Sequence, residues 1–276
     1  MATPRRFPYV AQDVLPGYNY RLLQTLGVGG MAVVWEAENA AIGRLVAIKI
    51  LFPEVAAKGH FDQEQMNREA RILSGLHALT PHVVDVLDAG VTADAHRLPF
   101  IVMEKLAGMT LRDSIRRRAS KGKPFAILEV VHICLEMTTA LAHAHENEIV
   151  HRDIKPENAF LHRGREGEKP SVRVLDFGIS EWTDGDAADW QGVKGTARYM
   201  APEQFRRGRV TPPADVYAMG LVTFELLTLE HPFEIGGRKL ERAEFEYVQC
   251  DVTPPRVSEF RADVPSSLVA LIAASR

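Results

Sequence analysis

Short runs of alternating apolar and polar side chains dominate the first hundred residues. Five runs have the alternation or the β-branched composition of strands, and they lie at residues 20–26, 32–38, 45–51, 83–87 and 100–103. Gly27, Gly29 and Gly30 mark the turn after the first run, and Gly43 lies in the turn before the third. Residues 1–19 contain three prolines and little periodicity, so we expect an irregular lead-in there.

Helical periodicity predominates in the rest of the chain. Helices are predicted at residues 62–76, 111–118, 128–148 and 215–229. In the first, the apolar side consists of Met66, Ala70, Leu73 and Leu76. In the third, Val131, Leu135 and Leu141 recur at helical spacing, which predicts that their side is buried. The fourth is apolar almost all round, which is typical of a helix at the centre of a domain.

The order of the predicted elements indicates an α+β fold. Two more short strands are expected at 159–162 and 172–175, on either side of a charged loop. A strand-rich first part therefore precedes a helix-rich second part, with the change near residues 104–108.

Composition and charge argue against several classes of protein. The 276 residues carry a net charge of −3, so no global basic surface points to nucleic acid or an anionic membrane. No apolar run approaches the ~18 residues that span a bilayer. The first residues also lack the apolar stretch of a secretory signal. Cys134 and Cys250 lie far apart, and we expect reduced thiols and a cytoplasmic location.

A glycine-rich turn and a lysine suggest a phosphate site. In the turn from Gly27 to Gly30, backbone amides can approach phosphate oxygens without interference from side chains. Lys49 lies on the strand that follows, where a buried ammonium requires an anion. A plain hairpin and a surface lysine are the alternative interpretation of these residues.

Three further strings concentrate polar groups in loops. His151-Arg152-Asp153-Ile154-Lys155-Pro156-Glu157-Asn158 follows the long helix, and Asp176-Phe177-Gly178 ends a predicted strand. Ala201-Pro202-Glu203 is the third string. The Asp176 carboxylate is a suitable ligand for a hard cation such as Mg²⁺. Any one string could be a solvated loop, but their order and spacing together are not expected by chance.

Taken together, these strings resemble the protein kinase family, in the form of the bacterial eukaryotic-like (Hanks-type) serine/threonine kinases. The resemblance implies a bilobal α+β fold over residues 20–276, with a small antiparallel N-lobe at about 20–104 and a hinge and helical C-lobe at about 105–276. Ala32 stands where the family has a third glycine.

The resemblance implies roles for individual residues. Asp153 corresponds to the catalytic base, assisted by Lys155, while Lys49 contacts phosphates and pairs with Glu69. Asn158 and Asp176 correspond to the metal ligands, for Mg²⁺ or alternatively Mn²⁺. The residues expected to bind ATP are Leu26, Gly27, Val28, Gly29, Gly30, Val34, Ala47, Lys49, Met103, Glu104, Leu106 and Phe160. Asp215 is expected to anchor the backbone of the catalytic loop.

The implied function is transfer of the γ-phosphoryl group of ATP to serine or threonine hydroxyls of a protein, in bacterial signalling. Lys155 and the segment 195–203, which we call the substrate segment, favour serine and threonine over tyrosine as acceptors. A pseudokinase that only binds partners is the rival from another class, although Lys49, Asp153 and Asp176 are all present. A small-molecule kinase is a further alternative, and the Ala201-Pro202-Glu203 string argues against it.

Regulation and assembly give two more expectations. Arg152, Thr183, Asp189 and Thr196 are the regulatory candidates, and residues 187–192 contain no hydroxyl side chain. We therefore expect basal activity without phosphorylation of this loop, with an aspartate such as Asp189 serving Arg152 as a weaker partner. The resemblance also implies a C-lobe without its last helix, which would leave Glu203 without its usual partner. The apolar surface left exposed would permit a homodimer.

Overall fold

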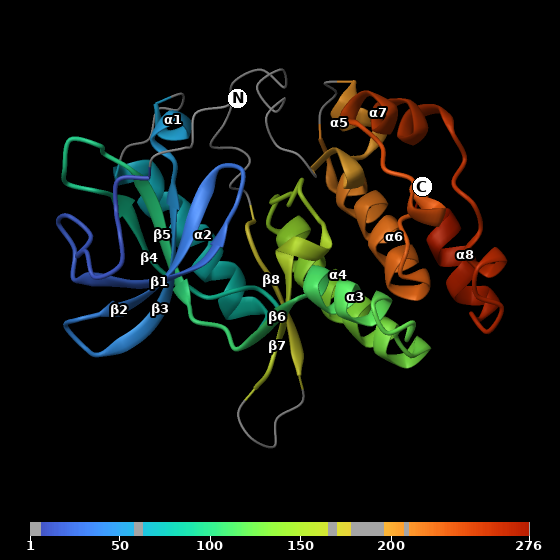
Figure 1. Ribbon diagram of the computed structural model, residues 1–276, viewed down its shortest axis with the longest axis horizontal. Coiled ribbons are helices and arrows are strands. Elements are labelled where there is room, and N and C mark those ends of the chain that lie inside the picture. Colours follow the sequence, from blue (N-terminus) through green and yellow to red (C-terminus); the bar gives the residue numbers. More distant parts are fainter. Residues whose placement is uncertain (1–6, 58–62, 165–169, 178–195, 207–209, 276) are drawn as a thin grey trace. The chain divides into compact units, whose positions relative to one another are not determined.

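The computed structural model describes residues 7–57, 63–164, 170–177, 196–206 and 210–275. They form two compact units, which we describe separately. The first unit contains residues 7–57, 63–79 and 84–106. The second contains the remaining described residues, from Thr80 to Val83 and from Ala107 onward. Figure 1 colours the chain from blue at the N-terminus to red at the C-terminus.

The first unit is built on a five-stranded antiparallel sheet with the strand order β1-β2-β3-β5-β4. Its strands are β1 (Tyr20–Val28), β2 (Ala32–Asn39), β3 (Arg44–Leu51), β4 (Val86–Val91) and β5 (Pro99–Glu104). Four of the five predicted strands are confirmed within a few residues. The sheet therefore follows from alternation and turn residues alone.

The strand predicted at 83–87 is wrong in its position. β4 begins at Val86 and continues to Val91, while Val83 forms an isolated bridge with Val174 in the second unit. Asp88 and Gly90 resemble turn residues in the sequence, which obscured the strand. Gly90 is required there for a different reason. A Cβ atom at this position would lie 2.2 Å from the hydroxyl oxygen of Tyr18.

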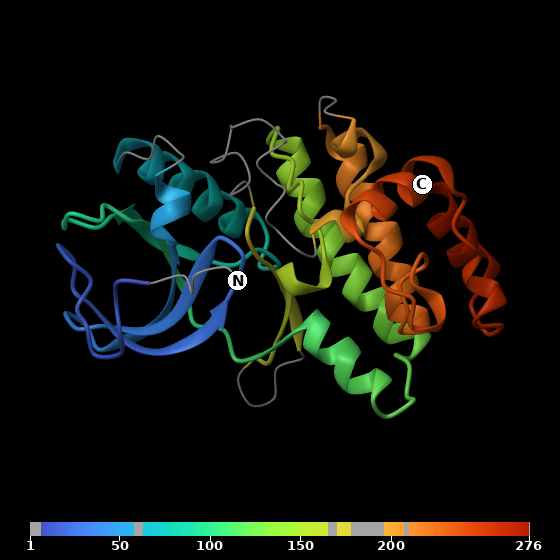
Figure 2. The ribbon, with the colours of Figure 1, turned by 45° about the horizontal axis from the view of Figure 1, so that its top comes forward.

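One face of this sheet carries a hydrophobic core. Its buried side chains include Val33, Trp35, Val46, Ile48, Ile50, Phe100 and Val102. These residues alternate along β2, β3 and β5, so their neighbours point to the opposite face. Helix α2 (Gln63–Leu79) packs against β4 and β5, and its Met66, Leu73 and Leu76 are buried as predicted. Figure 2 shows α2 beside the sheet, next to the short helix α1 (Pro53–Ala56).

Residues 7–19 cover part of this core. Leu15 is fully buried and Tyr9 is nearly so, and the ring of Phe7 stacks on that of Trp35. The backbone of the segment is tied to β1, since Gln12 N donates to Leu22 O at 2.7 Å and Leu15 N donates to Tyr20 O at 2.8 Å. The segment contains no helix, yet its side chains belong to the packed interior.

The second unit is mainly helical. Its helices are α3 (Leu111–Ala119), α4 (Ile127–Glu146), α5 (Pro202–Phe205), α6 (Pro212–Thr228), α7 (Arg242–Asp251) and α8 (Ser266–Ala274). Its three-stranded sheet consists of β6 (Gly108–Thr110), β7 (Ala159–His162) and β8 (Ser171–Val174). Figure 1 shows α6 between α4 and α8. Every residue of α6 from Tyr217 to Leu227 is buried, which confirms the predicted central helix.

Gly108 is needed where β6 joins β7. Its φ of 143° lies outside the range that other residues adopt readily, and a Cβ atom would lie 2.0 Å from Leu161 O. The close approach of these two strands therefore depends on the absence of a side chain.

The face of α4 predicted to be buried is partly wrong. The buried side chains are Val130, Ile133, Met137, Ala140, Leu141 and Ala144, whereas Val131 and Leu135 are 40% and 60% exposed. Apolar residues lie on both sides of this helix, so periodicity could not distinguish the sides. By length and composition α4 is the one helix in the described part of the chain that could cross a membrane. This is weak evidence, because buried core helices pass the same test and α4 packs against α6 and β8.

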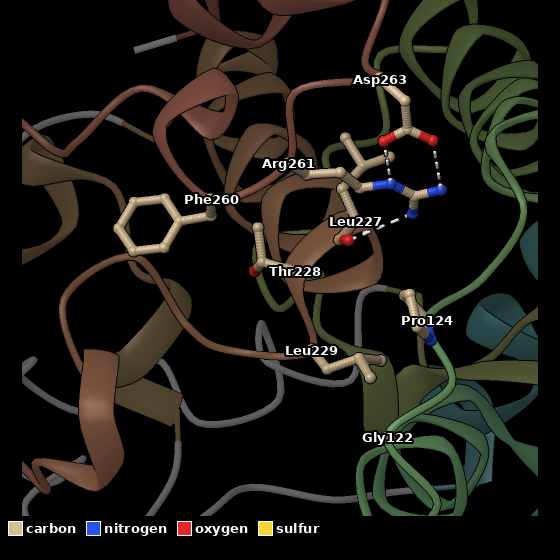
Figure 3. Close-up of a pocket in the computed structure, with 8 residues that line it drawn as sticks. All are labelled: Gly122, Pro124, Leu227, Thr228, Leu229, Phe260, Arg261 and Asp263. Carbon is tan, nitrogen blue, oxygen red and sulfur yellow. Dashed lines mark hydrogen bonds and ion pairs between the residues drawn. The ribbon is translucent and has the colours of Figure 1, made fainter.

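A loop near the C-terminal end of α6 is fixed by Arg261. Its Nη1 donates to Phe125 O at 2.7 Å. Figure 3 shows that Nη1 also donates to Leu227 O, at 3.2 Å, and that the guanidinium pairs with Asp263. A surface hollow of about 470 Å³ lies beside this contact, lined on its apolar side by Phe260 and Leu229.

We predict that Leu15→Ala lowers the free energy of unfolding by ~2–5 kcal/mol, because it opens a cavity in a filled core. Val14→Ala is the matched control, since the Val14 side chain is 53% exposed and its loss should change stability by less than ~0.5 kcal/mol. Denaturant unfolding measures both. Equal midpoints for the two variants would show that residues 7–19 do not contribute to the core.

Candidate active site

The predicted nucleotide-binding residues of the first unit share one face of the sheet. Val34 on β2 lies opposite Lys49 on β3, and Ala47 lies opposite Met103 on β5. All four alternate with the buried core residues and so point away from the hydrophobic core. The structure thus brings together four residues that lie up to 69 positions apart in the sequence.

The glycine-rich turn connects β1 to β2. Gly29 N donates to Ala32 O at 2.9 Å, which closes the turn. A Cβ atom at Gly27 would meet no atom within 4 Å, so the backbone is open to an approaching group. Leu26 is 45% exposed and Val28 is 69% exposed. A turn with an uncovered backbone is suited to an anion such as phosphate.

The remaining predicted residues of this group lie at the end of β5 and in other elements. Glu104 exchanges hydrogen bonds with Asp85, since its N donates to Asp85 O at 2.9 Å and its Oε1 accepts from Asp85 N at 3.1 Å. Leu106 ends the first unit, and Phe160 lies on β7 of the second. Glu69 lies in α2, but its side chain is outside the described part of the structure.

Asp153, Lys155 and Asn158 come together in the second unit. Lys155 Nζ donates to Asp153 Oδ2 at 2.6 Å, and Asn158 Nδ2 donates to the same oxygen at 3.1 Å and to Asp153 O at 2.8 Å. Asn158 belongs to the 3₁₀ helix η1 (Pro156–Asn158) and is buried. Two donors therefore hold the carboxylate of Asp153, the residue predicted to be the catalytic base.

Asp215 fixes the backbone of this loop. Its buried carboxylate accepts hydrogen bonds from His151 N at 2.9 Å, from Arg152 N at 2.8 Å and from His145 Nε2 at 2.8 Å. Arg152 has a φ of 67°, which is uncommon for a residue with a side chain, and the bonds on either side hold it there. Gln204 Nε2 donates to Arg152 O at 2.9 Å. The predicted anchoring role of Asp215 is confirmed.

Asp176 lies next to the segment that contacts Asn158. Leu175 N donates to Asn158 O at 2.8 Å, and His151 Nε2 donates to Leu175 O at 2.8 Å. The rings of His151 and Phe177 pack with their centroids 4.6 Å apart. Asp176 itself has a φ of 62°. These contacts set the backbone around the two predicted metal ligands.

The donor set of Asn158 and Asp176 fits a hard divalent cation. Both side-chain hydrogen bonds described for Asn158 use its amide nitrogen, so its side-chain oxygen is the atom that would bind a metal. Carboxylate and amide oxygens are the ligands that Mg²⁺ prefers. No group of three or more His, Cys, Asp or Glu side chains that could hold a metal occurs among the described residues.

The substrate segment is described from residue 196 onward. Its 3₁₀ helix η4 (Thr196–Tyr199) is held by Gln249, whose Nε2 donates to Ala197 O at 2.7 Å and to Arg198 O at 3.0 Å. The side chain of Thr196 lies outside the described residues, as do Thr183 and Asp189 entirely. Their predicted regulatory roles stay predictions.

Sequence analysis missed a set of buried charged residues beside this segment. Arg112 on α3 bonds Glu157 of η1 and Glu225 of α6, and Tyr199 lies between Arg112 and Glu225. Burial and the nearby Glu225 carboxylate raise the pKa of Tyr199 well above its usual value, so its hydroxyl stays protonated. No pattern in the sequence pointed to Arg112, because this residue lies in a run of charged residues that resembles a solvated helix.

Comparison with known proteins defines the class to which this arrangement belongs. The family described as "Protein kinase domain" matches residues 20–274, and the chain therefore belongs to the protein kinase family. Family membership implies use of ATP and a divalent metal ion.

The similar sequences are bacterial serine/threonine kinases. The chain is 36% identical over 255 residues to serine/threonine-protein kinase PrkC of Bacillus subtilis, covering 92% of this chain and 36% of that protein. It is 37% identical over 248 residues to serine/threonine-protein kinase Pkn1 of Myxococcus xanthus, covering 86% of this chain and 33% of that protein. The chain thus spans about a third of the length of these relatives.

A solved structure confirms the fold. The kinase domain of Mycobacterium tuberculosis PknI, in a double-mutant form, superposes with a TM-score of 0.70 at 24% sequence identity. The match covers 97% of this chain and 90% of that one. The predicted protein kinase fold, with an antiparallel sheet in one lobe and helices in the other, is therefore correct.

We predict that Asp215→Asn destabilises the second unit. The amide has one acceptor oxygen and no charge, so at least one charge-assisted hydrogen bond worth ~1.5–3 kcal/mol is lost. Turnover should fall as well, because the loop backbone that carries Asp153 loses its anchor. Denaturant unfolding and a phosphotransfer assay measure the two effects. Asp251→Asn, at an exposed position, is the control, and an unfolding midpoint equal to that of the control would contradict the anchoring role.

Proposed function

We propose that this chain is a serine/threonine protein kinase that transfers the γ-phosphoryl group of ATP to protein hydroxyls in bacterial signalling. The observation that carries the proposal is the cluster of Asp153, Lys155 and Asn158, with Lys155 Nζ at 2.6 Å and Asn158 Nδ2 at 3.1 Å from the same Asp153 oxygen. A carboxylate held in this way has a fixed direction, which acceptor positioning requires.

The reaction assigns each group a task. The acceptor hydroxyl oxygen forms a bond to the γ-phosphorus while the bond from that phosphorus to the bridging oxygen of ADP breaks. Asp153 orients the hydroxyl and accepts its proton. Lys155, whose Nζ lies 2.6 Å from Asp153 Oδ2, would stabilise negative charge on the transferred group.

The sheet residues would bind the nucleotide. Val34, Ala47 and Met103 provide an apolar surface on one face, where Lys49 adds a positive charge for the α- and β-phosphates. Asn158 and Asp176 would hold Mg²⁺, or alternatively Mn²⁺, which when bound neutralises phosphate charge. We also propose that the remaining expected residues contact ATP and that Lys49 pairs with Glu69. The protein is proposed to act in the cytoplasm.

Two rival functions make different predictions. A pseudokinase would bind nucleotide or partners without phosphoryl transfer, and a small-molecule kinase would ignore proteins. Incubation with radiolabelled ATP and either a generic protein acceptor or an aminoglycoside separates the three. Label on the protein supports the proposal. Label only on the small molecule, or on neither, overturns it.

We predict that Asp153→Asn lowers turnover by at least ~10², the scale of a lost positioned base, while nucleotide affinity stays nearly unchanged. Lys49→Met should also abolish most transfer. Lys121→Met, at an exposed position in the turn after α3, is the matched control and should retain the wild-type rate. Wild-type phosphorylation by both active-site variants would refute the assignment.

The homodimer expected through a C-lobe without its last helix stays a proposal, and we extend it to an apolar surface on α4. Leu128, Val131 and Leu135 lie on one side of α4 and are 66%, 40% and 60% exposed. Neighbouring apolar side chains exposed in this way are typical of interaction sites.

We predict that Leu128→Lys and Leu135→Lys shift the protein from dimer to monomer in sedimentation velocity experiments. Ile42→Lys, at an exposed position 70% accessible in the first unit, should leave the dimer intact. A wild-type protein that is monomeric at all concentrations would rule out the dimer.

A further inference from the structure

Arg112 is a buried cation near the substrate segment that the mechanism above does not use. It occupies the first turn of α3, and its side chain is 7% exposed. A buried guanidinium is retained only when its donors are paired, because removal from water costs several kcal/mol. All three of its nitrogens have partners in the second unit.

The partners of Arg112 belong to three different elements. Nε donates to Glu157 Oε1 at 2.8 Å in η1, and Nη1 donates to Glu225 Oε1 at 2.7 Å in α6. Nη2 donates to the hydroxyl of Tyr199 in η4, and that hydroxyl donates to Glu225 Oε2. One planar group thus spans the catalytic loop, the substrate segment and the central helix.

Further charges extend this set on the side of the substrate segment. Arg198 Nη2 donates to Glu225 Oε1 at 3.3 Å, and Arg198 Nε lies 2.8 Å from Glu234 Oε2. We call these six residues the Arg112 cluster: Arg112, Glu157, Arg198, Tyr199, Glu225 and Glu234. Its two guanidiniums and three carboxylates leave one net negative charge. Without Arg112, Glu157 and Glu225 would repel each other and Tyr199 would lose a donor.

The position of Glu157 connects this cluster to the chemistry. Glu157 immediately precedes Asn158, whose amide nitrogen holds Asp153. Tyr199 lies two residues before Ala201, whose N donates to Gln204 Oε1, and Gln204 in turn donates to Arg152 O. Arg112 therefore acts on the catalytic loop by two routes, through Glu157 from one side and through the substrate segment from the other.

We propose that Arg112 is a positioning residue that fixes the substrate segment relative to the catalytic loop, so that the acceptor hydroxyl meets Asp153. This inference rests on the proposed kinase function. The inference is that binding and turnover of the protein acceptor depend on Arg112. The affinity for ATP should change less, since the nucleotide residues on the sheet belong to the first unit and no described contact links them to Arg112.

The planar shape of the group matters as well as its charge. Lysine carries its three donors on a single nitrogen, so it cannot reproduce the planar spread of Nε, Nη1 and Nη2 that contacts Glu157, Glu225 and Tyr199. Guanidinium ion in solution has the required shape, and Glu157 provides a route to the cavity because its side chain is 45% exposed. The cavity left by alanine should therefore accept guanidinium.

The experiment compares Arg112→Ala, Arg112→Lys and the control Arg116→Ala with wild type. Arg116 lies one turn further along α3, is 72% exposed and pairs with Asp113. Steady-state kinetics are measured with a protein acceptor at saturating ATP, and then with ATP varied. Each assay is repeated with about 50 mM guanidinium chloride or with NaCl at the same ionic strength.

For Arg112→Ala we expect kcat/KM for the acceptor to fall about 10- to 100-fold, because hydrogen bonds to a charged group are lost. The KM for ATP should stay within about twofold of wild type. Guanidinium should restore at least about a third of the lost activity, whereas NaCl should not. Arg112→Lys should stay impaired, and Arg116→Ala should match wild type.

Several outcomes would overturn the inference. Wild-type kinetics for Arg112→Ala, an equal loss of affinity for ATP and acceptor, or the same response to guanidinium and NaCl would each do so. If Arg112→Ala does not fold, Tyr199→Phe removes the bridging hydroxyl and keeps both charges. It should raise the KM for the acceptor and leave the KM for ATP unchanged, and an unchanged acceptor KM would overturn the inference. Failure of the wild-type protein to phosphorylate any protein would instead refute the proposed function.

Discussion

The buried carboxylate of Asp215 is the interaction on which the second unit depends. It stands in the first turn of α6, a helix enclosed by protein along most of its length, so its position is fixed by packing. Two backbone amides of the loop at 151–152 donate to it, and they hold Arg152 in its left-handed conformation. The direction of the next residue, Asp153, follows from that conformation. The catalytic loop is thereby tied to a helix that is itself held by the core.

The same helix carries a second buried acid near its other end. Glu225 lies ten residues after Asp215, or about 15 Å along the helix axis at 1.5 Å per residue. The first acid holds the catalytic loop by its backbone, and the second holds the substrate segment through Arg112, Arg198 and Tyr199. Helix α6 therefore sets the distance between the catalytic loop and the substrate segment. Its apolar composition makes this possible, because only a tightly packed helix keeps two buried charges at a constant separation.

Much of this architecture is predictable from the sequence, and what is missed has physical reasons. Alternation and turn glycines predicted the strands of the first sheet, and the loop strings pointed to Asp153, Asn158 and Asp176. The strand at Val86 was misplaced because Gly90, which makes room for Tyr18, resembles a turn residue. The exposed side of α4 was misassigned because Leu135 and Ile133 are equally apolar, and only tertiary packing decides between them. Arg112 escaped notice since a charged residue is normally solvated, and its burial requires partners from three distant segments.

The covering of the first sheet by residues 7–19 has a consequence for the evolution of such chains. The family match begins at residue 20, so the layer formed by Phe7, Tyr9 and Leu15 lies outside the shared sequence. Trp35 and Val46 nevertheless pack beneath that layer and belong to the shared part. Substitutions on the two sides of this contact must be compatible with each other, although the family match covers only one side. If only the region of the family match were exchanged between two kinases, the sheet would come from one protein. The segment that covers it, equivalent to residues 7–19, would come from the other.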